Sequence, residues 1–233
     1  CCPCSQGRTR MRDNAARHSA AVGRDCGSRA PWVNARTNIC WISSGRKVTG
    51  GANGIGQVAV ELLRESGAKT GSLDRVESSA ADRSAIADVT DRESLRAAVE
   101  DVAEALGPID VLVCAAGIFA PPTPTVEVDE EMWGRVLGVN TWGTYAAIQE
   151  VLPGMVSRGY GRIVTVGSVS AFEGVHDGDL YAASKAAVIS LTRTVGRDVA
   201  QSGVLVNCVV PALIETGMAS ELSGRQYEEA VAK

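Results

Sequence analysis

Residues 49–56 read Thr49-Gly50-Gly51-Ala52-Asn53-Gly54-Ile55-Gly56, and this glycine-rich stretch decides the fold. It separates a very short predicted strand, Arg46–Thr49, from a Val- and Leu-rich predicted helix, Gln57–Ser66. Glycine is needed where a chain turns tightly and where backbone approaches a pyrophosphate. A helix that starts near Ile55 would direct its free N–H groups and positive dipole end at such phosphates. The spacing departs from G-x-G-x-x-G, so an ordinary strand-to-helix turn is the alternative interpretation.

An acidic residue follows at the distance expected for a ribose contact. Asp74 ends the next predicted strand, Lys69–Asp74, 18 residues after Gly56. A carboxylate there accepts both hydrogen bonds from an adenosine ribose diol and repels a 2′-phosphate, which favours NAD over NADP. Arg75 follows directly and would offset part of that charge. A solvated acid at a strand end is the alternative interpretation of Asp74.

A third predicted strand, Ala85–Val89, ends in the pair Asp88-Val89. Asp88 is placed to meet an adenine edge or, equally, to cap the next helix. Thr90 and Glu93 have the spacing of a capping box, in which each side chain satisfies a backbone N–H of the other, so we expect Thr90 to cap that helix. The apolar positions of the helix recur at helical spacing, at Leu95, Val99, Val102 and Leu106.

Strands and helices alternate along the rest of the chain. The strongest strands are apolar on both faces, which is typical of a parallel sheet covered by helices on both sides. The further predicted strands are Ile109–Cys114, Arg162–Val166 and Val204–Val210, and the further helices are Glu130–Arg158 and Tyr181–Gln201. The sequence therefore predicts an α/β fold with a Rossmann-like, doubly wound parallel sheet and helices on both faces.

Four polar residues in the second half of the chain form the candidate catalytic set. Tyr181 and Lys185 stand four residues apart and so share one face of a predicted helix. Ser168 ends the preceding strand, at the carboxyl edge of a parallel sheet, where ligands bind in such folds. Asn140 lies inside a predicted long helix, although Asn is a poor helix former. A surface Tyr–Lys contact and a structural Asn are the alternatives.

From about residue 45 to residue 220 the chain resembles the short-chain dehydrogenase/reductase family. The matching pieces are the T-G-x-x-x-G-x-G turn at Thr49–Gly56, the acid Asp74, the pair Asp88-Val89, the A-A-G at Ala115, Ala116 and Gly117, the set Asn140, Ser168, Tyr181 and Lys185, and Val206-Asn207 with Pro211 and Thr216 beyond. These matches occur in the family's order, which makes the resemblance far more specific than any single motif.

The resemblance implies an NAD(P)-dependent oxidoreductase that interconverts a secondary alcohol and a ketone by hydride transfer. Tyr181 would act as general acid/base, and Ser168 would position the substrate oxygen. Lys185 would hold the nicotinamide ribose and favour the tyrosinate, and Asn140 would support a proton relay to it through water. We also expect Lys185 to lower the pKa of Tyr181 by about three units, because a unit charge at ~4 Å supplies roughly that much.

The same resemblance implies which residues hold the cofactor, expected to be NAD, with NADP less favoured. These are Thr49, Gly50, Asn53, Gly54, Ile55, Gly56, Asp74, Asp88, Val89, Ala115, Ala116, Gly117, Tyr181, Lys185, Pro211, Ala212, Ile214 and Thr216. The sequence leaves the substrate open. Candidate residues for its binding site are Ile118, Phe119, Ala171, Phe172, Leu213 and Met218, and His176 is more simply a solvent-exposed loop residue.

The chain departs from the family at both ends. The first strand is short, and Ile39–Ile42 is the alternative segment for it. The family continues after the substrate loop with a helix and a last edge strand, so we expect residues 46–233 to be a C-terminally truncated domain lacking the usual C-terminal strand. Residues 1–45 show no sustained apolar period and are predicted to be a disordered or non-native extension. A non-catalytic or incomplete dinucleotide-binding or interaction protein is therefore the alternative function.

Composition and charge narrow the partners. Residues 1–47 hold nine Lys and Arg against two acids, whereas residues 48–233 hold 14 against 25, so the acidic main body makes nucleic acid an unexpected partner. No apolar run reaches membrane-span length, and the seven cysteines show no metal-ligand spacing. The odd cysteine count without a signal peptide predicts a cytoplasmic protein. The resemblance implies a homodimer or homotetramer acting on a small alcohol or carbonyl compound.

Overall fold

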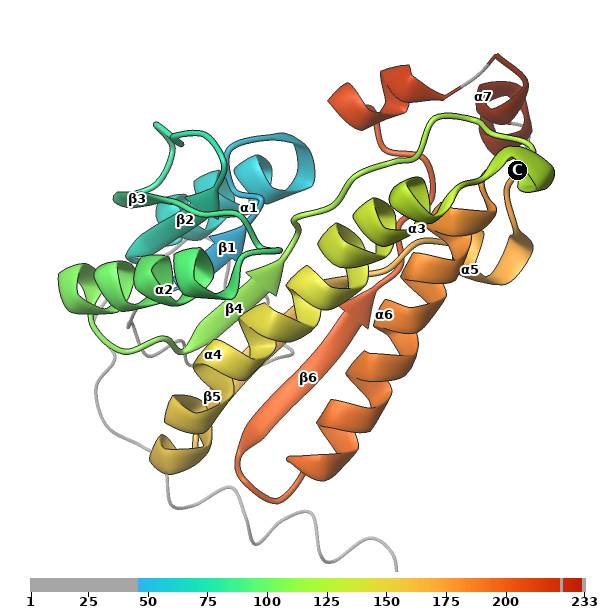
Figure 1. Cartoon of the computed structure of the whole chain (residues 1–233). Helices are drawn as coiled ribbons and strands as arrows, with labels where there is room; N and C mark the ends of the chain where they lie inside the picture. The colour runs from blue at the N-terminus through green and yellow to red at the C-terminus, as the bar shows by residue number, and fades with distance from the viewer. Residues whose placement is uncertain (1–45, 223, 232–233) are drawn as a thin grey trace, which may run out of the picture. The chain divides into compact units, whose positions relative to one another are not determined.

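The computed structural model describes residues 46–222 and 224–231. The expectations for residues 1–45, including Ile39–Ile42 as a first strand, lie outside the described residues. The described part forms a six-stranded, all-parallel sheet in the order β3-β2-β1-β4-β5-β6 (Figure 1). The strands are β1 Arg46–Thr49, β2 Thr70–Asp74, β3 Arg83–Ile86, β4 Val111–Cys114, β5 Gly161–Val166 and β6 Val204–Val209. The predicted doubly wound parallel sheet is confirmed.

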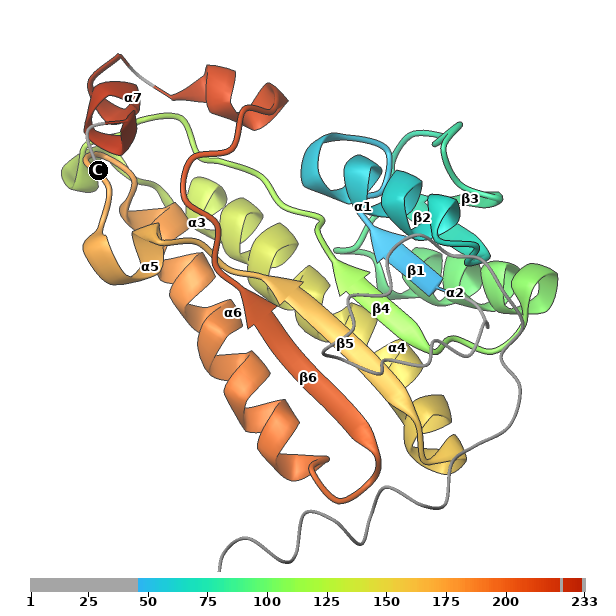
Figure 2. The same ribbon diagram turned by 180° about the vertical axis from the view of Figure 1, so that it is seen from behind.

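Helices cover both faces of the sheet. The helices α2, α4 and α6 lie along one face, whereas α1 packs on the other face against β1 and β2 (Figures 1 and 2). Their bounds are α1 Gly54–Glu65, α2 Arg92–Leu106, α3 Glu130–Leu137, α4 Gly143–Arg158, α5 Ser170–Glu173, α6 Asp179–Asp198 and α7 Gly224–Val231. The main apolar cluster includes Leu95, Leu112, Ile148 and Ile163, between the sheet and α2 and α4. Within the described ranges, no helix is long and apolar enough to cross a bilayer.

The direction of winding reverses between β1 and β4. From β1 the chain moves outward to β2 and β3, then returns to β4 and continues outward to β5 and β6 on the other side. The loops after β1 and β4 therefore diverge at the carboxyl ends of two neighbouring strands, which is where ligands bind in open parallel sheets. The segment after β6, with the short helix η3 Gly217–Glu221 and α7, lies at this same end of the sheet (Figure 1).

The predicted cap of α2 is wrong. Asp91, not Thr90, caps the helix, because its carboxylate accepts hydrogen bonds from the N–H groups of Glu93 at 3.0 Å and Ser94 at 3.3 Å. Thr90 donates instead to the Asp88 carboxylate, from its N–H at 2.9 Å and its hydroxyl at 2.7 Å. An acid at the cap satisfies the first-turn N–H groups and also carries the charge that the helix dipole favours.

The predicted single helix Glu130–Arg158 is interrupted at its centre. Between α3 and α4 lies a π-helical turn, Gly138–Trp142, in which the N–H of Gly143 donates to the carbonyl of Gly138. A π turn holds one more residue than an α turn and is common at functional sites. Asn140 stands at the middle of it, so the position where the sequence disfavours an α-helix is the position where the α-helical pattern fails.

The central strand β1 is buried along its whole length, including two charged residues. Arg46 is 5% exposed and Lys47 is 1% exposed. The Lys47 side chain runs beside Gly71 of β2, and its ammonium donates to the carbonyl of Val99 in α2 at 3.0 Å. Burial lowers the pKa of Lys47 to about 7, and the charge of Arg158 adds to the effect. The short first strand is thus part of the core, with a titratable group inside it.

Candidate active site

The turn after β1 requires glycine at two positions. Gly50 has a φ of +68°, and a Cβ on it would lie 2.6 Å from the backbone nitrogen of Ala116. A Cβ on Gly56, in the first turn of α1, would lie 2.0 Å from the carbonyl oxygen of Gly50. Both positions face backbone atoms that cannot move aside. The turn, the start of α1 and the loop after β4 can therefore meet only because these residues lack side chains.

This turn has the form that a pyrophosphate needs. Asn53, the N-cap residue of α1, is extended and makes no side-chain capping hydrogen bond in the described structure. The first N–H groups of α1 therefore remain for a ligand, at the positive end of the helix dipole. Asp74 ends β2 beside the turn and accepts hydrogen bonds from the N–H groups of Ala52 at 3.0 Å and Val76 at 3.4 Å. These residues fit a dinucleotide, with phosphates at the helix end and a ribose diol near the carboxylate.

Replacing Gly56 with Ala tests this close approach. We expect Gly56→Ala to lose about 1–3 kcal/mol of unfolding free energy, because the new Cβ meets backbone. It should also weaken NADH binding by at least about tenfold, since the turn must open. Urea unfolding and NADH fluorescence titration measure the two effects. Gly134→Ala in α3 is the matched control, because its Cβ meets no atom within 4 Å. Equal behaviour of the two variants would contradict the close approach.

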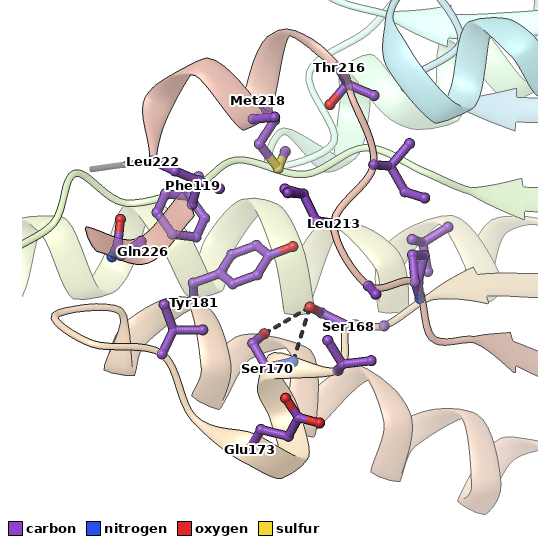
Figure 3. A pocket seen from close by; sticks show the side chains of 18 of the residues that line it. Phe119, Ser168, Ser170, Glu173, Tyr181, Leu213, Thr216, Met218, Leu222 and Gln226 are labelled. Carbon is purple, nitrogen blue, oxygen red and sulfur yellow. Dashed lines mark hydrogen bonds between the residues drawn. The ribbon is translucent and has the colours of Figure 1, made fainter. Parts of the chain in front are cut away.

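A cavity of about 370 Å³ opens at the carboxyl ends of β5 and β6. Ser168, two residues after the end of β5, and Tyr181, in the first turn of α6, line it, and the Tyr181 hydroxyl points toward Ser168 (Figure 3). Ile55, from the glycine-rich turn, lines the same cavity. The predicted cofactor residues Pro211, Ala212, Ile214 and Thr216 line it from the loop after β6. The structure thus brings two predicted catalytic residues and the glycine-rich turn to one space.

Tyr181 is held by an aromatic neighbour and a hydroxyl. Its ring packs against Phe119 with 4.7 Å between the ring centroids. Burial raises the pKa of Tyr181, and a side-chain hydrogen bond with Ser168 lowers it in part. The expected strong lowering by Lys185 is not found, because the Lys185 ammonium lies 5.6 Å from the ring centroid and is directed to the carbonyl of Val166. A phenol with a raised pKa is protonated at neutral pH and is suited to donate a proton.

Lys185 places a buried positive charge at the ends of β4 and β5. Its side chain is 5% exposed, and its ammonium donates to the Val166 carbonyl at 2.9 Å. A Cβ on Gly117, in the loop after β4, would lie 3.5 Å from this ammonium. Burial lowers the pKa of Lys185 to about 8, so most of the side chains remain charged at pH 7. The i and i+4 spacing thus puts Lys185 one helical turn from Tyr181, with its ammonium over the Tyr181 ring at 5.6 Å from the centroid.

Asn140 connects the loop after β4 to the helix that carries Tyr181. It is fully buried, and its amide accepts a hydrogen bond from the N–H of Ile118 at 2.8 Å and donates to the carbonyl of Ile118 at 3.0 Å. The same NH₂ group donates to the Ser184 hydroxyl at 2.9 Å, and that hydroxyl donates to the carbonyl of Tyr181 at 2.7 Å. These contacts give the side chain a structural role, and the proton relay stays a prediction.

The A-A-G segment after β4 lies against the glycine-rich turn. The N–H of Ala115 donates to the Thr49 carbonyl at 3.0 Å, and the N–H of Ala116 donates to the Thr49 hydroxyl at 3.4 Å. Gly117 follows, next to Asn140 and Lys185. The glycine-rich turn and the A-A-G segment, which are both predicted to contact the cofactor, are therefore adjacent at the ends of β1 and β4.

The pair Asp88-Val89 is placed by protein contacts. Asp88 accepts two hydrogen bonds from Thr90, which lower the pKa of its carboxyl group. Val89 is 7% exposed, and its side chain meets Gly143 at the start of α4. Asp88 therefore stabilises the turn before α2 rather than capping the helix, and its contact with an adenine stays a prediction.

Three polar residues of the cavity were not predicted from the sequence, namely Ser170, Glu173 and Gln226. The signal for Ser170 was its spacing of two residues from Ser168 at a strand end. Gln226 belongs to α7, a helix that the sequence analysis did not predict, and its amide donates to the carbonyl of His176 at 2.6 Å. That contact fixes α7 to the loop before α6, so a segment far along the chain completes the wall of the cavity.

Three of the six candidate substrate-binding residues line the cavity, and three do not. Phe119, Leu213 and Met218 line the cavity, as predicted, whereas Ile118, Ala171 and Phe172 are not among its lining residues in the described structure. Phe172 is 64% exposed. Its side chain, on the short helix α5, is thus largely exposed. No group of three or more His, Cys, Asp or Glu side chains in the described part is placed to hold a metal ion.

The comparisons with known proteins agree with this geometry. The sequence model of the short chain dehydrogenase family matches residues 47–226. The chain is 36% identical over 189 residues to 2-dehydro-3-deoxy-L-rhamnonate dehydrogenase (NAD(+)) of Sphingomonas sp., covering 78% of this chain and 76% of the relative. It is 36% identical over 195 residues to the 3-oxoacyl-[acyl-carrier-protein] reductase of Vibrio cholerae, covering 80% of each.

A solved structure is similar as well. The 3-ketoacyl-(acyl-carrier-protein) reductase of Brucella melitensis, complexed with NADH, superposes with a TM-score of 0.73 at 26% sequence identity, over 77% of this chain and 79% of that one. Family model, sequence relatives and structure thus all name dehydrogenases and reductases. The chain belongs to the short-chain dehydrogenase/reductase family of oxidoreductases.

Proposed function

We propose that this protein interconverts a secondary alcohol and a ketone with NAD as cofactor, and that Tyr181 exchanges the proton. The observation that carries the proposal is the shared cavity, in which Tyr181 and Ser168 meet a residue of the glycine-rich turn, Ile55. The NAD(+) in the name of the Sphingomonas relative and the NADH in the Brucella structure support the cofactor class. The carboxylate of Asp74 beside the turn favours NAD over NADP.

Each residue has a task that follows from its position. Ser168 and Tyr181 place two neighbouring hydroxyl groups on the cavity wall, where a carbonyl or alcohol oxygen of the substrate would be bound. The nicotinamide, when bound, accepts or supplies the hydride. Lys185 holds a positive charge 5.6 Å from the centre of the Tyr181 ring, which would favour the tyrosinate as the proton leaves. Asn140 keeps the loop after β4 in register with α6.

The proposal is tested with the full chain. NADH fluorescence titration should show binding, and absorbance at 340 nm should show NADH formation with at least one member of a panel of secondary alcohols, or NADH consumption with a ketone. Binding without any turnover would favour the alternative, a non-catalytic dinucleotide-binding protein. Light scattering of the same sample tests the expected homodimer or homotetramer.

Asp74 should set the cofactor preference. We expect Asp74→Ser to reduce the ratio of kcat/KM for NAD to that for NADP by about 100-fold, because the variant loses both the ribose acceptor and the repulsion of a 2′-phosphate. The ratio is insensitive to a general loss of stability, which the broken contact with Ala52 would cause. Glu77→Ser, an acid of the same exposed loop, is the control and should leave the ratio unchanged. An unchanged ratio in Asp74→Ser would contradict the ribose assignment.

The two reaction directions should differ in pH dependence. Because burial raises the pKa of Tyr181, the phenol is protonated at neutral pH. Ketone reduction needs that proton, so its kcat/KM should be highest at neutral pH and fall as the pH approaches the pKa of Tyr181. Alcohol oxidation needs the tyrosinate, so its kcat/KM should rise about tenfold per pH unit below that pKa. Parallel pH profiles in both directions would show that another group carries the proton.

A further inference from the structure

Ser170 occupies both acceptor positions of the Ser168 hydroxyl. It is the first residue of α5 and is 5% exposed. Its hydroxyl donates a hydrogen bond to the Ser168 Oγ at 2.8 Å, and its backbone N–H points at the same oxygen at 3.3 Å (Figure 3). Two donors from one residue thus converge on the oxygen that faces Tyr181.

A serine hydroxyl has one proton to donate and two lone pairs to accept with. With both lone pairs engaged by Ser170, the Ser168 oxygen has no acceptor position left for a third partner. The single proton of Ser168 is then the group that remains for the cavity, where the Tyr181 oxygen lies. A hydroxyl that accepts hydrogen bonds also becomes a stronger donor, because successive bonds polarise one another.

We propose that Ser170 is a positioning residue that makes Ser168 a dedicated hydrogen-bond donor toward the reacting oxygen atoms. The inference rests on the proposed function for its catalytic meaning, since Ser170 acts on substrate only through Ser168. Its structural setting is fixed, because the carbonyl of Ser170 accepts the N–H of Gly174 and so closes the single turn of α5. The backbone of Ser170 is therefore held in place by the helix turn, and its hydroxyl is directed to Ser168.

The first test needs no turnover and follows the ionisation of Tyr181. Tyrosinate absorbs near 295 nm, so the pH titration of the wild type minus that of Tyr181→Phe isolates the pKa of Tyr181. We then compare Ser170→Ala with the double variant Ser170→Ala/Tyr181→Phe in the same way. The pKa of Tyr181 should be higher by about half a unit to one unit than in the wild type, because Ser168 donates less strongly to the tyrosinate. An unchanged pKa would overturn the proposal whether or not the protein is an enzyme.

The second test separates positioning from a structural role by kinetics. Ser170→Ala should lower kcat about tenfold, with KM for NAD within about twofold, and should move the alkaline limb of alcohol oxidation in step with the pKa of Tyr181. Ser170→Thr keeps the hydroxyl and should restore most of the rate. A higher KM and a lower melting temperature, without any shift of the alkaline limb of alcohol oxidation, would show that Ser170 only supports the fold.

A matched control is available on α6. Thr192 is 4% exposed, and its hydroxyl lies 2.7 Å from that of Thr165 without contacting Ser168. Thr192→Val removes a buried hydroxyl of the same kind and should lower the melting temperature without moving the pKa of Tyr181. If the proposed function is wrong, the wild type will turn over no substrate. If the Ser170 inference is wrong, the pKa of Tyr181 will be the same in Ser170→Ala as in the wild type.

Discussion

Tyr181→Phe is expected to reduce turnover about a thousandfold or more in both directions while leaving NADH binding within about threefold of the wild type. The substitution removes one oxygen and keeps the ring, so the packing against Phe119 at 4.7 Å survives. The missing oxygen is the group that would give its proton to the ketone or take it from the alcohol. The neighbouring Ser168 hydroxyl cannot replace it, because a serine hydroxyl is too weak an acid at neutral pH.

Initial rates at saturating cofactor and NADH fluorescence titration measure the two quantities. Tyr145→Phe is the control, since Tyr145 on α4 contacts Trp142 of the π turn at 6.3 Å between ring centroids and is not among the residues that line the cavity. It should retain full activity. A Tyr181→Phe variant that loses NADH binding as strongly as turnover would show that Tyr181 supports the fold and not the chemistry.

Lys47→Met is expected to raise the free energy of unfolding at pH 7 by about 1–4 kcal/mol, the range found when buried charged groups are replaced by apolar ones of similar size. Lys47 is 1% exposed in the central strand β1, and its ammonium donates to the Val99 carbonyl at 3.0 Å. That carbonyl belongs to α2 and keeps its helical hydrogen bond without Lys47. Methionine follows the same unbranched path beside Gly71 without carrying a charge into the core.

The gain should depend on pH in a defined direction. The pKa of Lys47 is lowered from 10.5 to about 7 in the folded chain, so between these values the unfolded chain binds a proton that the folded chain does not. The stability contributed by Lys47 therefore rises with pH across this window. The advantage of Lys47→Met should be largest below pH 7 and shrink toward pH 10. Urea unfolding at several pH values measures it, and exposed Lys69→Met should stay within about 0.5 kcal/mol throughout.

The fold was predictable because its signals are local. The glycine-rich turn, the apolar strands and the helical spacing of residues such as Leu95 and Val102 are set by nearby residues, and they define the alternation of a parallel sheet. The site follows from the same alternation, since Ser168 and Tyr181 stand at the end of one strand and the start of the next helix. Parallel topology then brings both to the edge that Ile55 also reaches.

The remaining features depend on contacts between distant segments. Nothing near Lys47 in sequence shows that it is buried, because its environment is made by Gly71 and Val99 of other elements. The contribution of Gln226 to the cavity likewise requires α7 to fold back over the loop before α6. The pKa of Tyr181 is raised where the sequence predicted that it is lowered, for the same reason. The spacing puts Lys185 on the correct face of α6, but the Val166 carbonyl decides where its ammonium points.

The π turn at Gly138–Trp142 has a consequence for how such a helix can vary. A π turn holds one residue more than an α turn, and here the extra residue is taken up between the end of α3 at Leu137 and the start of α4 at Gly143. Removing one residue from this stretch is expected to restore the α-helical hydrogen-bond pattern between α3 and α4 and to redirect the amide at position 140. A change of one residue in the length of the connection between β4 and β5 can therefore present or withdraw the amide that joins Ile118 to Ser184.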